Sequence, residues 1–190
     1  MKIENIEIKR LDSEIKPTTV WHYTKTEYLP RIEETGALLP KSEAEYACTT
    51  PIIKGVYISS VPLVWFSSDQ LWEHATSQLN GTGYRSQSWQ KIAYEMKAIR
   101  YGISINDPRL INWEKTCELA GANREERRQR KMLIPQARKA GSNPALWFSS
   151  PVPIPLEDLN FEMWLNGNWK KVDRALIRRK LYELGKLETC

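Results

Sequence analysis

The chain of 190 residues has few of the residues that mark several common classes of protein. Its three cysteines, Cys48, Cys117 and Cys190, are odd in number and far apart, so neither a disulfide framework nor a zinc cluster is expected. No stretch approaches the roughly 20 consecutive apolar residues that a membrane-spanning helix needs. The start of the chain, MKIENIEIKR, lacks the apolar segment of a signal peptide. We therefore expect a cytoplasmic protein without a metal and without a membrane partner.

Positive charge is concentrated in two short segments. Residues 124–139 contain seven Lys/Arg and two Glu, which gives 7 − 2 = +5, and residues 170–180 contain six Lys/Arg and one Asp, which gives 6 − 1 = +5. Two such segments suit an anionic partner, either a nucleic-acid acceptor or a phosphorylated ligand, although solvated helix faces have the same composition. Neither zinc-finger spacing nor a helix-turn-helix pattern supports binding to duplex DNA.

The first third of the chain predicts strands followed by a short helix. Apolar and polar residues alternate over 3–11, as in a half-buried strand, and a second strand is expected over 19–23. Because Pro30 is tolerated only near a helix start, the following helix should begin around Thr26, and Gly36 should end it.

The middle of the chain predicts a buried strand and then a helix. Residues 61–66 (VPLVWF) are apolar on both alternating faces, which indicates a strand buried on both sides. Ser67 and Gln70 have the spacing of a capping box, which predicts a helix over 69–80. Residues 89–105 are expected to be extended.

The last part predicts a helical insertion and a hairpin. Segment 106–142 is charged and helical in composition, and we expect it to lie on the surface of a sheet-based core. Asn166-Gly167, between the segments 160–165 and 168–172, is the commonest signal for a two-residue hairpin turn. A basic helix should follow over 173–185. Together these features predict a single α+β domain, 1–190, with a split, mainly antiparallel sheet.

One short sequence occurs twice. Val64-Trp65-Phe66-Ser67-Ser68 resembles Leu146-Trp147-Phe148-Ser149-Ser150, but the flanking residues do not match. The similarity therefore predicts two strands of similar burial and no repeat architecture.

The only two histidines are both followed two residues later by threonine, His22 by Thr24 and His74 by Thr76. Two-histidine phosphodiesterases carry such a motif on each of two neighbouring strands, with one imidazole as base and the other as acid. His22 lies in a strand-like setting, but His74 falls inside the 69–80 helical pattern. In a helix, residues two apart point about 200° away from each other, so His74 and Thr76 could not hold one phosphate.

A longer pattern begins at the same histidine. The order Trp21-His22-Tyr23-Thr24, a short helix, Gly36 and Leu39-Pro40 resembles the opening of several branches of the ADP-ribosyltransferase superfamily, including toxins that modify DNA bases and the RNA 2′-phosphotransferases. The segments VWFS, WEHAT and PVPIPLEDLNFEMWLNGNW also resemble a pattern of uncharacterised bacterial and phage proteins. The resemblance implies an ADP-ribosyltransferase-like fold, NAD as substrate, and a role in conflict between phage and host.

The resemblance also implies a set of site residues. His22 would bind the ribose and amide of NAD, and Glu162 would be the carboxylate that orients the ribose, with Glu73 as the alternative. Other residues would line the nucleotide site: Tyr23, Thr24, Tyr57, Trp65, Ser67, Ser68 and Trp72.

The chemistry accounts for these residue types. Cleavage of the nicotinamide–ribose bond develops oxocarbenium-like charge, which a fixed carboxylate stabilises. Ser67 and Ser68 at a helix N-terminus would meet the pyrophosphate, and Trp65, Tyr23 and Trp72 would stack on the rings. The same residues also have structural interpretations, because most of eight tryptophans must be core and Ser67 could simply cap its helix.

The sequence leaves enzyme and binder open. A protein of this type could hold an ADP-ribose-derived or cyclic nucleotide without reacting it, since sequestration needs the same stacking and phosphate contacts. The lead hypothesis is NAD-dependent ADP-ribosyl transfer or NAD cleavage, and the alternative is a non-catalytic nucleotide sponge.

Overall fold

A computed structural model describes residues 17–41, 61–76, 88–120, 134–135, 137–139 and 141–185. Its strands are β1 (Thr19–Lys25), β2 (Ala37–Leu38), β3 (Val64–Ser67), β4 (Ala98–Ser104), β5 (Ile111–Asn112), β6 (Trp147–Ser150), β7 (Ile154–Pro155), β8 (Asn160–Leu165) and β9 (Asn168–Lys171). Its helices are η1 (Thr26–Tyr28), α1 (Leu29–Thr35), α3 (Trp89–Glu95), α4 (Trp113–Ala120), η3 (Pro144–Leu146), η4 (Leu156–Asp158) and α6 (Arg174–Glu183). The expected strand over 3–11, Tyr57 and most of the basic segment 124–139 lie outside the described residues.

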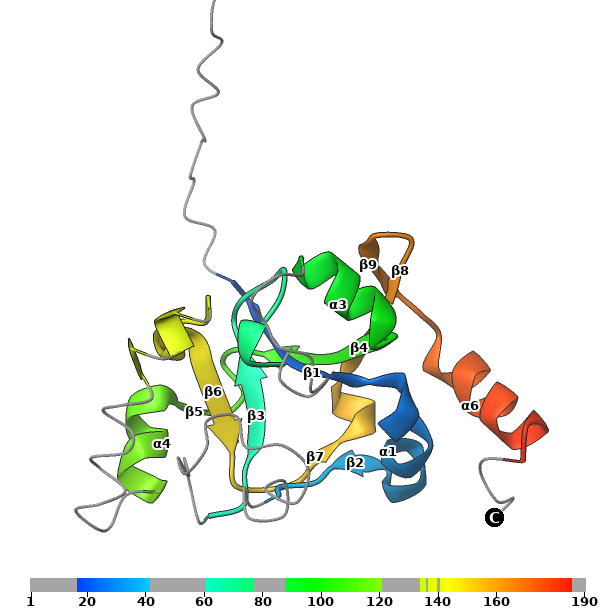
Figure 1. The fold of residues 1–190 in the computed structure, drawn as a ribbon. Helices are drawn as coiled ribbons and strands as arrows, with labels where there is room; N and C mark the ends of the chain where they lie inside the picture. The colour runs from blue at the N-terminus through cyan, green and yellow to red at the C-terminus, as the bar shows by residue number, and fades with distance from the viewer. Residues whose placement is uncertain are drawn as a thin grey trace, which may run out of the picture.

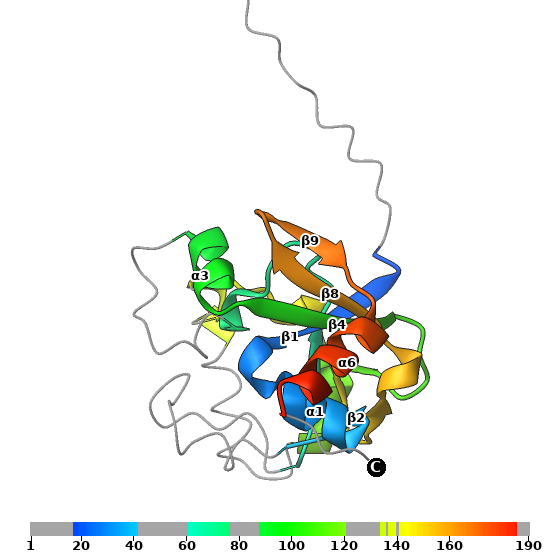
Figure 2. The same ribbon diagram turned by 90° about the vertical axis from the view of Figure 1, so that its right-hand side faces the viewer.

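The fold is α+β, as predicted, and its main sheet is antiparallel. Seven strands run in the order β5-β6-β3-β1-β4-β8-β9, and β2 and β7 form a separate pair. In Figure 1, β1 and β4 cross the centre of the molecule between α3 and α1, while α4 lies beside β5 and β6. Figure 2 shows α6 packed near α1 on the side of the sheet away from α3.

The strand register determines which side chains share a face. Tyr23 lies opposite Arg100, and Arg100 lies opposite Glu162, so these three side chains lie on one face. His22, one residue before Tyr23, lies opposite Tyr101, one residue after Arg100, and both therefore lie on the other face.

We call the face of the sheet that carries Tyr23, Arg100 and Glu162 the tryptophan face. It packs against α3 and the loop after β3 through one cluster of core residues: Trp21, Tyr23, Trp72, Ile92, Ala93, Met96, Ala98 and Trp164. We call the opposite face, which carries His22 and Tyr101, the histidine face. It packs against α1, α6 and η4 through a larger cluster: Val20, Leu29, Leu38, Val64, Phe66, Ile99, Tyr101, Ile103, Ile154, Leu156, Phe161 and Leu181.

Several local predictions are confirmed. The helix after β1 ends at Gly36, which adopts the left-handed φ of 65° that glycine tolerates. Asn166 and Gly167 join β8 to β9 with φ of 52° and 80°, as a type I′ turn requires. The expected terminal helix is α6, and Asp173 caps it by accepting a hydrogen bond from the backbone N–H of Ala175.

The repeated sequence forms two strands that pair with each other. Phe66 lies opposite Phe148, Trp65 opposite Ser149, and Ser67 opposite Trp147, and both strands have the same burial pattern. The pairing is therefore locally two-fold symmetric about the two phenylalanines. The predicted similarity of burial is confirmed.

Two predictions are wrong. Residues 89–95 form α3 and not a strand, because Ser88 accepts a hydrogen bond from the N–H of Lys91 and so caps the helix. The start of the expected 69–80 helix is a loop, and only 74–76 form a single 3₁₀ turn within the described residues. The carboxylate of Asp69 accepts hydrogen bonds from the N–H groups of Leu71 and Trp72 and holds a turn there instead.

The expected insertion contributes to the sheet. Ile111 and Asn112 form the edge strand β5, which pairs with β6, and α4 follows directly. Among the described residues no helix has the length and apolar character that a membrane span requires.

Candidate functional site

His22 lies half-buried on the histidine face of the central strand β1. Its Nδ1 lies 2.8 Å from the carbonyl oxygen of Trp65, and its ring contacts Phe66 edge-on at a centroid distance of 6.0 Å. A carbonyl oxygen can only accept, so Nδ1 must carry the hydrogen. The hydrogen bond therefore selects the tautomer whose Nε2 is an acceptor.

The protonation of His22 follows from its surroundings. Burial lowers the pKa of the imidazole, and the hydrogen bond to Trp65 offsets this only in part. His22 is thus neutral at pH 7. Within the described part of the chain nothing occupies Nε2, which leaves an acceptor with a fixed direction.

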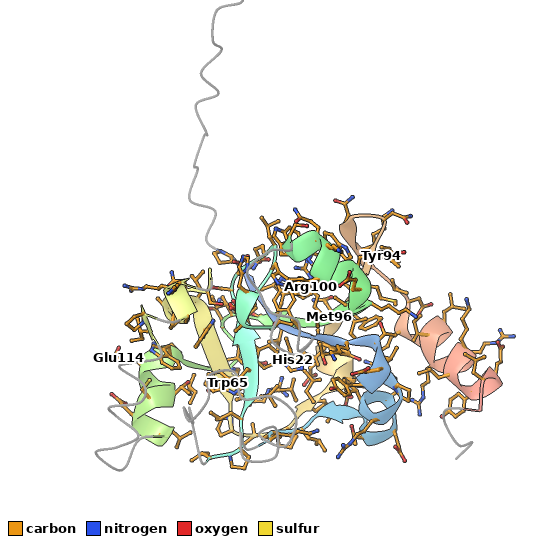
Figure 3. All side chains as sticks on the ribbon, viewed as in Figure 1. His22, Trp65, Tyr94, Met96, Arg100 and Glu114 are labelled. Atoms are coloured by element: carbon orange, nitrogen blue, oxygen red, sulfur yellow. The ribbon has the colours of Figure 1, made fainter. Side chains whose placement is uncertain are left out.

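The expected carboxylate Glu162 does not lie near His22. It belongs to the tryptophan face, where Arg100 Nε (2.8 Å) and Nη2 (2.5 Å) both donate to its Oε2. Figure 3 shows Arg100 on the side of α3 and His22 on the other side of β1. The structure therefore does not bring His22 and Glu162 into one site.

Arg100 is enclosed as well as paired. Its guanidinium lies between the rings of Trp21 and Trp169, 3.9 Å and 4.4 Å from their centroids, and it also donates to the carbonyl of Gln70 at 2.7 Å. Such stacking is favourable for a planar cation. Sequence reasoning missed Arg100, although a lone arginine within the otherwise uncharged strand 98–104 was a signal that it is buried and paired.

The alternative carboxylate, Glu73, is buried and accepts four hydrogen bonds. Its donors come from three separate segments: Ser67 Oγ at 2.8 Å, Ala75 N–H at 3.1 Å, Trp147 Nε1 at 2.9 Å, and Ser142 Oγ. Both carboxylate oxygens are used. Glu73 therefore joins β3, β6 and the 141–143 loop and has no free lone pair aimed at a ligand.

Ser67 belongs to the same network. Its hydroxyl donates to Glu73 and accepts from the N–H of Asp69, and Ser68 bonds to the carbonyl of Leu146 through both its N–H and its hydroxyl. Residues 69–73, which follow these serines, form a loop. The helix N-terminus that was expected to meet a pyrophosphate at Ser67 and Ser68 is therefore not there.

The remaining predicted nucleotide-site residues separate by face. Tyr23, Trp65 and Trp72 lie on the tryptophan side, whereas Thr24 shares the face of His22 and Tyr57 lies outside the described residues. Tyr23 donates to the carbonyl of Asp69 at 2.6 Å, and burial raises the pKa of its hydroxyl. Trp72 is stacked between Trp89 and Trp169. Tyr23 and Trp72 are core residues, and Trp65 is partly buried against Ala137 and Trp147.

The second histidine is not paired with the first. His74 lies in the 3₁₀ turn after Glu73, with its ring directly over Gly141, where a Cβ would come within 3.1 Å of the ring. His22 contacts Phe66 and Trp65 instead. The two imidazoles share no contact within the described residues, and a two-histidine phosphodiesterase site does not form there.

A third buried carboxylate, which sequence reasoning missed, lies on the histidine side. Glu33 of α1 is 2% exposed, and its Oε1 lies 3.3 Å from Arg174 Nε of α6. Neither of its oxygens accepts a hydrogen bond, and the buried hydroxyl of Tyr101 also lacks one, in the part of the chain that is described. Burial raises the pKa of Glu33, and Arg174 and Arg178 lower it only in part.

Comparison with protein-family models, curated proteins and solved structures finds no match. No group of three or more His, Cys, Asp or Glu suited to a metal ion is present among the described residues. The interpretation of the site therefore depends on its own geometry.

Proposed function

We propose that the protein binds NAD or another ADP-ribose-containing nucleotide on its histidine face, and that binding without cleavage is its function. The observation that carries this proposal is the hydrogen bond from His22 Nδ1 to Trp65 O. It presents a neutral imidazole whose Nε2 accepts a hydrogen bond from a ribose hydroxyl or from the carboxamide NH₂.

The positions of the carboxylates favour a binder over an enzyme. Cleavage of the nicotinamide–ribose bond calls for a carboxylate beside the developing positive charge. Glu162 is neutralised by Arg100 on the opposite face, and Glu73 is fully engaged by four donors. Neither carboxylate reaches a sugar that is bound at His22 without rearrangement of a core network.

Labelled NAD and ADP-ribose test the proposal directly. The pure full chain is titrated with each ligand by isothermal calorimetry, and nicotinamide release is followed over hours with and without DNA or RNA. We expect saturable binding of at least one ligand and no release of nicotinamide. His22→Gln should weaken the binding at least tenfold, because one hydrogen bond in a desolvated site contributes about 1.5 kcal/mol.

A matched variant controls for non-specific loss. His74→Gln changes the other histidine, which contacts Gly141, and should bind the ligand as the parent protein does. If the parent protein releases nicotinamide and Glu162→Gln does not, the result would support the ADP-ribosyltransferase hypothesis instead. Failure of both ligands to bind would refute the proposed function.

A further inference from the structure

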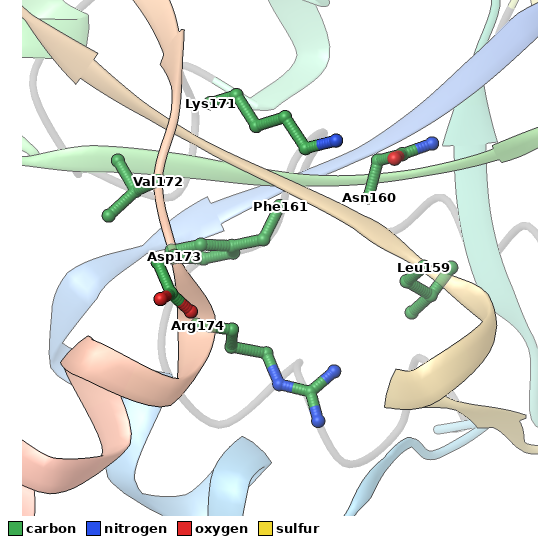
Figure 4. Close-up of a pocket in the computed structure, with 7 residues that line it drawn as sticks. All are labelled: Leu159, Asn160, Phe161, Lys171, Val172, Asp173 and Arg174. Carbon is green, nitrogen blue, oxygen red and sulfur yellow. The ribbon is translucent and has the colours of Figure 1, made fainter.

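A groove of about 490 Å³ opens where the β8–β9 hairpin separates into η4 and α6. Figure 4 shows the residues that line it: Leu159, Asn160, Phe161, Lys171, Val172, Asp173 and Arg174. The volume is in the range of small-ligand sites. Its walls are apolar at Leu159 and Val172, and its rim carries two cations and one amide.

Nearby acids are already engaged. Asp173 caps α6 through the N–H of Ala175, and Asp158 pairs with Arg109 at 2.7 Å. Lys171 is exposed on β9 and lies opposite Glu162. The groove lining carries two cations, Lys171 and Arg174, and one acid, Asp173, which gives 2 − 1 = +1 and suits an anion.

Arg174 is held only partly by the protein. Its Nη1 donates to the carbonyl of Leu156, and its Nε lies 3.3 Å from Glu33 Oε1 without forming a hydrogen bond. A guanidinium has five donors in a planar fork, so N–H groups remain for a further acceptor. The side chain of Arg174 is 29% exposed, which makes it reachable from the groove.

We propose that this groove binds a phosphate group through Arg174, with Lys171 adding positive charge at its rim, and that Glu33 competes with the phosphate for Arg174. Arginine and lysine are the side chains that hold phosphate in proteins, arginine through two parallel N–H···O bonds. The phosphate can belong to a free nucleotide or to a nucleic-acid backbone. This site is distinct from the His22 site and does not depend on the function proposed above.

The competition couples phosphate binding to a proton. When Arg174 turns toward the phosphate, Glu33 stays buried without its counter-charge, and an isolated buried carboxylate takes up a proton from solvent. The other groups that face it are the hydroxyl of Tyr101 from β4 and Arg178 from α6. Phosphate binding is therefore accompanied by proton uptake.

The test uses inorganic phosphate, a nucleoside monophosphate and a single-stranded oligonucleotide as probes, in a His22→Gln background that removes the first site. Binding of the small probes identifies a free nucleotide as the source of the phosphate, and binding of the oligonucleotide alone identifies a nucleic-acid backbone. Either result supports the proposal, and no binding of any probe overturns it.

Variants assign the binding to the groove. Arg174→Gln should weaken it about tenfold because it removes charge-assisted hydrogen bonds to the phosphate, and Lys171→Gln should weaken it by less because it removes only a charge at the rim. Arg179→Gln is the matched control, because Arg179 lies on the same helix but pairs with Glu183 and does not line the groove. An equal loss in Arg179→Gln would reduce the binding to general electrostatics and overturn the proposal.

The competitor has its own test. Glu33→Gln should strengthen phosphate binding and remove the proton uptake, which calorimetry in buffers of different ionisation enthalpy measures. Weaker binding in a folded Glu33→Gln protein would contradict the competition. If Arg174→Gln fails to fold, the double variant Glu33→Gln/Arg174→Gln removes both charges together and should still lose the site.

Discussion

On the tryptophan face the buried carboxylate of Glu73 accepts four hydrogen bonds, whereas on the histidine face the buried carboxylate of Glu33 accepts none from the described residues. The same contrast holds for the neighbouring groups. Arg100 uses Nε, Nη1 and Nη2, while among the described residues nothing bonds to Nε2 of His22 or to the hydroxyl of Tyr101.

The difference separates stability from function. Buried polar groups that are fully bonded fix one arrangement of the core, and those with unused atoms are the ones that a ligand or a proton can still engage. We propose that the polar network of the tryptophan face is structural, and that the histidine face, which also contains the larger core cluster, is the side that binds a ligand. The four predictions below test this contrast.

The largest expected effect is on the tryptophan face. Arg100→Met removes the counter-charge of Glu162 and should lower the free energy of unfolding by about 3–5 kcal/mol, the range for breaking a buried pair. Denaturant unfolding measures the loss. Arg100→Lys, which keeps the charge but not the planar fork, should lose less. A change below about 1 kcal/mol would show that this network is not structural.

Glu73→Gln should cause the next largest loss in the free energy of unfolding. The amide NH₂ of glutamine would face donors such as Trp147 Nε1 and the serine hydroxyls, so at least one buried bond is lost at a cost of about 2–3 kcal/mol. Glu114→Gln, on the exposed surface of α4, is the control and should be neutral. Thermal unfolding compares the melting temperatures of Glu73→Gln and Glu114→Gln. Equal melting temperatures would show that the hydrogen bonds of Glu73 do not stabilise the fold.

Gly102→Ala tests the packing beneath Arg100. A Cβ at Gly102 would lie 2.5 Å from Cζ3 of Trp21, so the ring that stacks on Arg100 must shift. We expect a loss of about 1–3 kcal/mol, as for overpacked cores. Trp21→Leu in the same chain should relieve part of the clash, and strictly additive losses would argue against direct contact.

The smallest expected effect is the pH dependence that Glu33, on the histidine face, gives to the free energy of unfolding. Since burial raises the pKa of Glu33, the folded state binds its proton more tightly than the unfolded chain does. The free energy of unfolding should therefore decrease as pH rises from the ordinary value of 4.5 through the raised pKa. Glu33→Gln should remove this slope, and an unchanged slope would assign it to another group.

The sequence predicted the features that depend on neighbouring residues. The Asn166-Gly167 turn and the helix end at Gly36 follow from backbone preferences that only a few residues set. The helix α3 was wrongly predicted as extended, although Ser88 before Trp89, Ile92 and Met96 at helical spacing was a local signal for a helix.

The candidate site was less predictable because it depends on strand register. A shift of one residue moves a side chain to the other face of a sheet, so the sequence could not establish that His22 and Glu162 point in opposite directions. The partner of Glu162 is Arg100, 62 positions away. Likewise, Gln70 was read as part of a capping box, but its side chain bonds to Trp21 and Thr19 across the sheet.

Nitrogen-15 NMR of the imidazoles tests the central contrast most directly, because the chain contains only two histidines and His74→Gln assigns the spectrum. At pH 7 the spectrum of His22 should be that of a neutral ring with the hydrogen on Nδ1. Addition of ADP-ribose should shift its Nε2 resonance and leave the indole N–H of Trp169 unchanged. A ring with the hydrogen on Nε2, or a ligand that shifts the Trp169 indole and not His22, would contradict the account.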